Sequence, residues 1–110
     1  MCGICGIIDL KNNLVRLETL HPMMQRMKYR GPDDEGCFIY RNVGLGFVRL
    51  SIIDLSKAGH QPFHDESNRY TIVFNGEVYN YIELREELKE TGITFTTQTD
   101  TEVLLKAYMY

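Results

Sequence analysis

The chain has 110 residues, and its 12 basic and 15 acidic side chains leave a net charge of −3. This length allows one domain, and a content of 44% hydrophobic and 25% charged residues excludes wholesale disorder. The acidic balance offers no surface for nucleic acid or an anionic membrane, and the apolar runs are far too short to span a bilayer. The N-terminus lacks a signal-peptide pattern, so we expect a cytoplasmic protein.

The cysteine content argues against a disulfide framework. The chain has 3 cysteines, Cys2, Cys5 and Cys37, an odd number in a sequence without an export signal. We therefore expect free thiols or functional residues.

The first half of the chain predicts a strand, a helix and a β-hairpin. An apolar run at 5–10 is typical of a buried strand, and apolar residues at helical spacing between 17 and 27 predict a helix. In that helix Pro22 is expected to be tolerated only in a first turn. Two runs of β-forming residues, 36–41 and 43–50, predict a hairpin that turns at Arg41-Asn42.

The second half predicts, in order, a loop at 56–68, a strand at 70–74, a helix from Asn80 to Gly92, a strand at 93–97 and a helix from Thr99. Asn80 with Glu83, and Thr99 with Glu102, match the capping-box pattern of helix N-termini. Gly92 is a typical C′ residue. The last helix reaches Tyr110 without a stop signal, so we expect the chain to be part of a longer protein.

Cys2 is the first candidate for chemistry. Removal of Met1 would place a thiol and a free α-amine on one residue, and a terminal amine has a pKa of about 7.7–8.0, suitable for a base. A nucleophile activated by its own N-terminal amine is an established catalytic arrangement. The alternative is that Cys2 only begins a strand.

Asn75-Gly76 follows directly on a predicted strand. An Asn side-chain amide and a Gly backbone N–H at a strand end can form a two-donor oxyanion hole, for which Cys2 is the one candidate nucleophile. The alternative is a hairpin turn, since Asn-Gly is the commonest two-residue turn.

Three charged residues are suited to hold a zwitterion. Arg49, at the end of an apolar strand, could bind a carboxylate bidentately, and Glu77 and Asp100, at strand-to-helix junctions, could accept from an ammonium group. The alternatives are that Arg49 extends its charge to solvent and that Asp100 only supports the following helix.

A zinc site is a minor alternative. Cys2, Cys5, His60 and His64 are the ligand types of a Cys₂His₂ site, but the two pairs are much farther apart than in a zinc finger. A chain with enough apolar residues for a core needs no metal to fold, so we expect no metal.

Six motifs resemble the class II, N-terminal nucleophile type of glutamine amidotransferase domain found at the start of glutamine-hydrolysing asparagine synthetases. They are Met1-Cys-Gly-Ile-Cys-Gly6, Arg30-Gly-Pro-Asp-Asp34, Arg49-Leu-Ser-Ile-Ile-Asp54, Gly59-His-Gln-Pro62, Asn75-Gly-Glu-Val-Tyr-Asn80 and Thr99-Asp-Thr-Glu102. Any one is weak evidence, whereas six in order are specific. The resemblance covers residues 1–110, which we interpret as the N-terminal part of such a domain without its synthetase domain.

The resemblance implies an α+β fold, the α/β/β/α sandwich of N-terminal nucleophile hydrolases, incomplete in a chain this short. It also implies a role for each matching residue: Cys2 as the nucleophile with its amine as base, Asn75 and Gly76 as the oxyanion hole, Arg49 as the partner of the substrate carboxylate, Glu77 and Asp100 as partners of the substrate ammonium, and Leu50, Ser51, Ile52 and Ile53 as the pocket wall.

The implied reaction is hydrolysis of L-glutamine to glutamate and ammonia through a Cys2 thioester, with no cofactor. The resemblance further implies that ammonia passes to a C-terminal synthetase domain that uses ATP and Mg²⁺. The alternative is an inactive fragment that acts as a folding or self-association module, because an incomplete sandwich exposes sheet edges that favour homo-oligomers.

Overall fold

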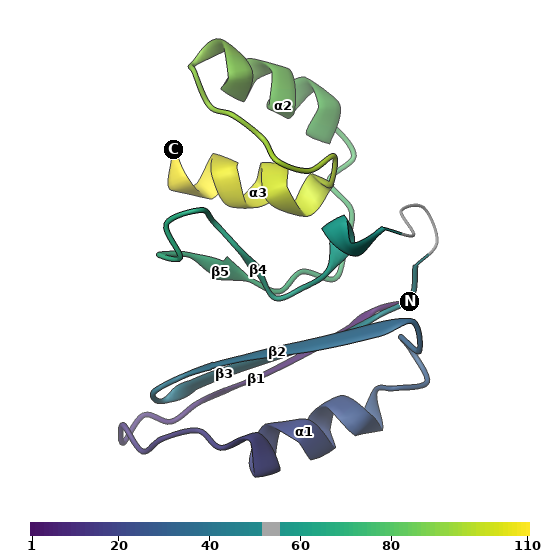
Figure 1. Ribbon diagram of the computed structural model, residues 1–110, viewed down its shortest axis with the longest axis vertical. Coiled ribbons are helices and arrows are strands. Elements are labelled where there is room, and N and C mark those ends of the chain that lie inside the picture. Colours follow the sequence, from purple (N-terminus) through teal and green to yellow (C-terminus); the bar gives the residue numbers. More distant parts are fainter. Residues whose placement is uncertain (52–55) are drawn as a thin grey trace.

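The computed structural model describes residues 1–51 and 56–110, which form an α+β fold (Figure 1). Its elements are β1 (Gly3–Ile8), α1 (Leu17–Arg26), β2 (Asp34–Tyr40), β3 (Val43–Arg49), the short 3₁₀ helix η1 (Lys57–Gly59), β4 (Phe63–His64), β5 (Thr71–Ile72), α2 (Tyr81–Glu90) and α3 (Asp100–Met109). Within these residues no helix is both long and apolar enough to cross a membrane.

A three-stranded antiparallel sheet has the order β1-β3-β2. The predicted hairpin between β2 and β3 is confirmed: it turns at Arg41, whose φ of 53° is left-handed, and Asn42. The first strand begins earlier than the apolar run at 5–10 predicts, because pairing with β3 extends to Gly3, which lies opposite Val48. This register brings the chain's N-terminal residues to the end of β3.

Helix α1 packs against one face of this sheet through a core of Leu20, Met24 and Val48. The close approach requires glycine on β3, since a Cβ at Gly46 would lie 2.7 Å from the Met24 side chain. The expectation for Pro22 is wrong, because Pro22 lies inside the helix and not in its first turn. Leu20 and Met24, two residues before and after Pro22, are buried in the core, and their packing offsets the backbone hydrogen bond that Pro22 cannot donate.

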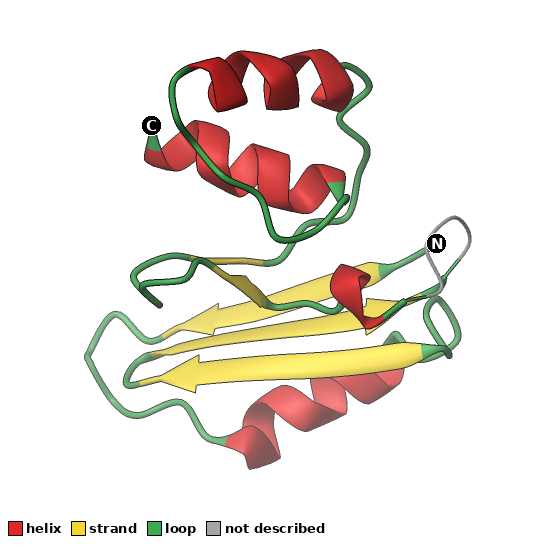
Figure 2. Ribbon diagram, turned by 45° about the horizontal axis from the view of Figure 1, so that its top comes forward, coloured by secondary structure: helices red, strands yellow, loops and turns green. Residues whose placement is uncertain are grey.

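The other face of the three-stranded sheet is turned toward β4 and β5, with α3 beyond them and α2 packed on α3 (Figures 1 and 2). The rings of Phe38 on β2 and His64 on β4 meet edge to face, 5.0 Å between centroids. The loop predicted at 56–68 is therefore corrected. Its beginning forms η1 and its middle forms β4, which pairs with β5. No local sequence pattern predicts this pairing. The predicted strand at 70–74 is shortened to β5.

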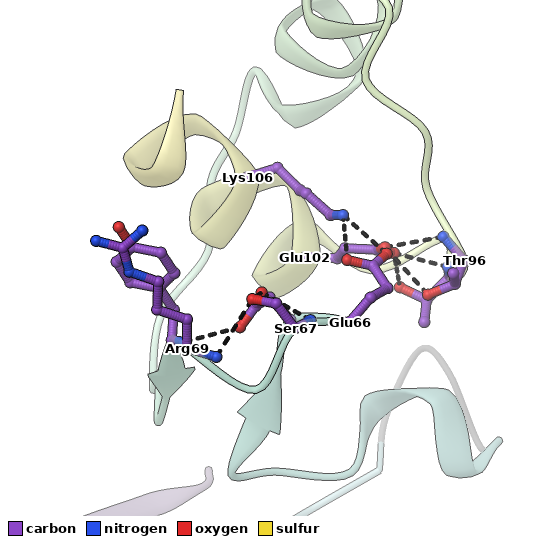
Figure 3. Close-up of polar contacts among 9 residues, drawn as sticks. Glu66, Ser67, Arg69, Thr96, Glu102 and Lys106 are labelled. Atoms are coloured by element: carbon purple, nitrogen blue, oxygen red, sulfur yellow. Dashed lines mark hydrogen bonds and ion pairs between the residues drawn. The ribbon is translucent and has the colours of Figure 1, made fainter.

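The strand predicted at 93–97 is also wrong. The amide groups of Thr96 and Thr97 donate to the carboxylate of Glu102, at 2.8 and 2.6 Å, and this bonding replaces a strand partner (Figure 3). Glu102 is fully buried. Its side chain thus supports the loop before α3 and does not close a capping box onto Thr99.

The helix ends agree only in part with their predicted caps. The Thr99 hydroxyl accepts from the Glu102 N–H at 3.3 Å, as an N-cap does. Asn80 precedes α2 as predicted but makes no side-chain cap hydrogen bond. Gly92, with φ 93°, follows the end of α2 as predicted.

The turn from β4 to β5 is stabilised by buried Asp65. Its carboxylate accepts from the Ser67 hydroxyl and from the backbone N–H groups of Ser67 and Tyr70, and these bonds, the Ser67 hydroxyl first, lower the pKa of Asp65 to about 2. Beside this turn, Lys106 of α3 reaches Glu66 at 2.6 Å and lowers the pKa of Glu66 (Figure 3). This ion pair attaches the β4–β5 hairpin to α3.

Candidate active site

The meeting of β1 and β3 places Cys2 beside the backbone that leaves β3. The thiol lies against Leu50, whose N–H points to Sγ at 3.5 Å and whose carbonyl lies 3.8 Å from it. Cys2 is half-buried and, like Cys5 and Cys37, is a free thiol, as predicted.

The Cys2 carbonyl receives two side chains from distant segments. Asn75 donates from Nδ2 at 3.1 Å, and Arg30 donates from Nε at 3.2 Å. The Asn75 amide has two N–H donors, so one remains for a bound group next to the thiol. Asn75-Gly76 is not a simple hairpin turn: Tyr81 opens α2 a few residues later, and residues 77–110, all of which the structure describes, contain no strand.

Arg49 is buried, with 8% of its surface exposed, so its charge does not extend to solvent. Its Nη1 donates to the Ser56 carbonyl at 2.7 Å, and Gly59 packs directly on the guanidinium. Asp33 supports the adjoining backbone: its N–H donates to the Arg49 carbonyl and its carboxylate accepts from the Ser51 N–H. The guanidinium is therefore held in one orientation.

Asp100 and Glu77 also line the site. Asp100 opens α3, and its Oδ2 accepts from the Val78 N–H at 3.0 Å, which ties the segment after Gly76 to this helix. Asp100 consequently does more than support its own helix. Glu77 is exposed.

These residues line one cleft of about 970 Å³. The predicted residues in its wall are Cys2, Arg49, Leu50, Ser51, Asn75, Gly76, Glu77 and Asp100. Ile52 and Ile53, also predicted as pocket wall, lie outside the described residues. The cleft thus joins a thiol, amide donors, a fixed cation and two carboxylates, the groups that acyl transfer on a zwitterionic amide requires.

The four residues of the zinc alternative do not come together. His60 contacts Asp34 at 2.6 Å, and His64 contacts the Thr71 hydroxyl at 2.8 Å. Across residues 1–51 and 56–110 there is no group of three or more His, Cys, Asp or Glu side chains placed to hold a metal ion.

Comparison with known protein families shows to which family the chain belongs. The profile of the glutamine amidotransferase domain matches residues 1–110. The chain belongs to this family. The family that the six motifs predicted is therefore confirmed.

Its relatives include synthetases and amidases. The chain is 49% identical to asparagine synthetase (glutamine-hydrolysing) 1 of Bacillus subtilis, covering 100% of this chain and 18% of that protein. It is 38% identical to asparagine synthetase B of Escherichia coli, covering 98% of this chain and 19% of that protein. It is also 38% identical to amidase chry2 of Gibberella zeae, covering 100% of this chain and 18% of that protein.

The chain thus spans about a fifth of the length of these relatives. All three names denote enzymes, so the comparisons lend no support to the alternative of a folding or self-association module.

Two residues at or beside the cleft of this glutamine amidotransferase domain were given no role by the sequence. Arg30 lies beside Cys2, and Gln61 lies in the cleft wall. Both belong to the quoted motifs, Arg30-Gly-Pro-Asp and Gly59-His-Gln-Pro. The motifs were a signal that these residues matter, but only the folded chain shows what each one contacts.

Proposed function

We propose that the chain hydrolyses L-glutamine to glutamate and ammonia through a thioester on Cys2. The single observation that supports this most is the joining of Cys2, Asn75 and Arg49 in one cleft of a glutamine amidotransferase domain. Each is far from the others in sequence, and a cleft serving only structure has no need for this combination.

The nucleophile is Cys2 after removal of Met1. Its own α-amine takes the Sγ proton, and Sγ attacks the side-chain amide carbon of glutamine. The new S–C bond gives a tetrahedral intermediate with negative charge on oxygen. When the C–N bond breaks, the protonated amine gives this proton to the leaving nitrogen, and ammonia departs. Water then attacks the thioester carbon and gives a proton to the same amine. The S–C bond breaks, Sγ receives that proton, and glutamate is released.

The oxyanion is stabilised by Asn75 Nδ2 and the Gly76 N–H. The Asn75 amide already lies 3.1 Å from the Cys2 carbonyl, which keeps it close to the reacting thiol before substrate binds. Donors that are in place beforehand need no reorganisation as charge develops, and removing one such donor typically costs about 10²- to 10³-fold in kcat.

Substrate selection rests on charge. The Arg49 guanidinium binds the α-carboxylate, and Asp100 with Glu77 binds the α-ammonium. The Asp100 atom Oδ1 is available for this purpose, because Oδ2 is the atom that accepts from Val78. Charges on both sides of Cα select a free amino acid over a peptide.

The ammonia would be used by an ATP-dependent synthetase domain of asparagine synthetase type. The fold of this chain would form part of the α/β/β/α sandwich of N-terminal nucleophile hydrolases. The hydrolysis steps above use only water and groups of this chain, so we assign ATP and Mg²⁺ to the synthetase domain.

Intact mass tests this proposal, measured before and after incubation with a diazo-ketone analogue of glutamine. We expect a mass without Met1 and one adduct, mapped to Cys2 and blocked by excess glutamine. Cys37→Ser, which changes an exposed cysteine, should label like the parent, whereas Cys2→Ser should not label. Retention of Met1, or an adduct that glutamine does not block, would contradict the proposal.

A further inference from the structure

We propose that Gln61 is a positioning residue that holds Asn75-Gly76 and Asp100 at a fixed separation. The inference rests on the proposed function, because these two segments are the oxyanion and ammonium partners of glutamine. Gln61 itself has no role in the reaction steps above.

The side-chain amide of Gln61 joins two segments of the cleft. It is buried, with 6% of the residue exposed. Its Oε1 accepts from the Phe74 N–H at 2.6 Å, and its Nε2 donates to the Phe74 carbonyl at 3.2 Å and to the Thr101 hydroxyl at 3.4 Å. One carboxamide thus binds both backbone groups of one residue and the side chain of another.

The two partners are the immediate neighbours of the functional residues. Phe74 precedes Asn75, and Thr101 follows Asp100. Strand β5 ends at Ile72, before Phe74. The Gln61 amide therefore provides at Phe74 the pair of hydrogen bonds that an adjacent strand would provide, and it ties that point to the first turn of α3.

Gln61 is in turn anchored on the sheet that carries the nucleophile. Gly36 of β2 packs against the Gln61 carbonyl, and a Cβ at Gly36 would overlap it and would lie 2.9 Å from the His60 ring. Strand β2 pairs with β3, whose end adjoins Cys2. The contacts thus run without interruption from the sheet through Gln61 to both substrate-binding segments.

Loss of the amide should release both segments. Buried donors and acceptors that lose their partner are strongly unfavourable, so the Phe74 backbone would shift to find new partners. A displacement of about 1 Å in a group that positions substrate can cost about 100-fold. We expect Gln61→Met, which keeps the side chain's length and removes its hydrogen bonds, to lower kcat by about 10- to 100-fold and to raise KM.

Gln61→Glu provides a sharper test. A neutral carboxylic acid at this position accepts from the Phe74 N–H and donates to its carbonyl, as the amide does, whereas a carboxylate only accepts and repels that carbonyl. The ratio of variant to parent kcat should therefore rise as pH falls through the pKa of the introduced carboxyl. The other titratable groups are shared with the parent and cancel in this ratio. They are Arg49, Glu77, Asp100 and Cys2 with its α-amine in the cleft, and the neighbouring pair His60 and Asp34.

The experiment measures glutamate release per active site, with active sites counted by the diazo-ketone label. A residue needed only for folding would change the number of sites but not kcat or KM per site. Gln25→Met is the matched control, since Gln25 is an exposed residue of α1. Unchanged kcat and KM per site in Gln61→Met, or a kcat ratio for Gln61→Glu that does not depend on pH, would overturn the proposal.

Amide hydrogen exchange separates this inference from the proposed function. If the parent neither labels nor hydrolyses glutamine, the proposed function fails. The positioning role is then decided by the amides of Phe74, Asn75 and Gly76 and by that of Thr101. Faster exchange at both segments in Gln61→Met, with β1 and β3 unchanged, supports the role, and unchanged exchange overturns it.

Discussion

Gly59→Ala should impair glutamine binding while leaving the fold intact. Gly59 is half-buried beside Arg49, and its backbone packs on the guanidinium. The variant adds one methyl group and removes no hydrogen-bonding group. It therefore asks whether the position of the guanidinium, and not only its presence, matters for binding.

The expected size follows from the geometry. The added Cβ would overlap Nη2 of Arg49 and lie 2.6 Å from its Cζ, whereas ordinary contacts begin at 3.4 Å, so the guanidinium must move by more than about 0.8 Å. A hydrogen bond to a charged group contributes about 1.5–3 kcal/mol. Losing one from the substrate carboxylate should lower kcat/KM about 10- to 100-fold, mainly through KM. The displaced guanidinium also donates to the Ser56 carbonyl, so the free energy of unfolding should fall by no more than that one hydrogen bond contributes, about 1.5–3 kcal/mol.

The assay compares two substrates. Release of the hydrolysis product is measured with glutamine and with 4-aminobutanamide. The second compound has the same amide and amine but no carboxylate. We expect Gly59→Ala to lower kcat/KM for glutamine and to leave that for 4-aminobutanamide near the parent value. Gly6→Ala is the control, since its Cβ would meet neighbours at 3.3 and 3.4 Å, close to ordinary contact.

Equal losses for both substrates would refute the reasoning, because Arg49 would then not act on the carboxylate. An unchanged KM for glutamine would refute it as well. A large fall in thermal stability would show that Gly59 supports the fold and not the guanidinium alone.

Three further predictions follow from the same structure. Asn75→Ala should lower kcat about 10²- to 10³-fold with little change in KM, and an unchanged kcat in glutamate release would contradict its oxyanion role. Asp100→Asn keeps an oxygen for the Val78 N–H but loses its charge, so KM for glutamine should rise about 10-fold, whereas a substrate without the α-amine should be unaffected. The pKa of Asp65 is lowered from 3.8 to about 2, so its carboxylate stabilises the fold above about pH 4, and this contribution is lost as pH falls toward 2. The free energy of unfolding, measured with urea, should therefore fall more steeply over that pH range in the parent than in Asp65→Asn. An equal fall with pH in both proteins would contradict this.

Much of the fold follows from local patterns. The helical spacing of Leu20 and Met24 marks a face that the structure buries, and Arg41-Asn42 turns the hairpin as predicted. The failures are places where a distant partner takes over. The strand expected at 93–97 gives its amides to Glu102, and part of the loop expected at 56–68 pairs with β5.

Some features of the site could likewise be predicted from the sequence, and others could not. The sequence alone identified the candidate thiol at Cys2, the donors at Asn75-Gly76 and the charges at Arg49 and Asp100, because each residue type has a chemistry and each motif a place in the chain. It determined the family for the same reason, since ordered motifs need no coordinates.

Only the tertiary structure decided which of these groups meet. Cys2 and Asn75 are 73 positions apart and are joined by one hydrogen bond, which no local periodicity encodes. The same holds for Gln61, whose buried amide connects Phe74 with Thr101. A side chain's chemistry is carried by its own atoms and can be predicted from its identity. Its partners are set by how sheets and helices pack, and they become known only when the chain has folded.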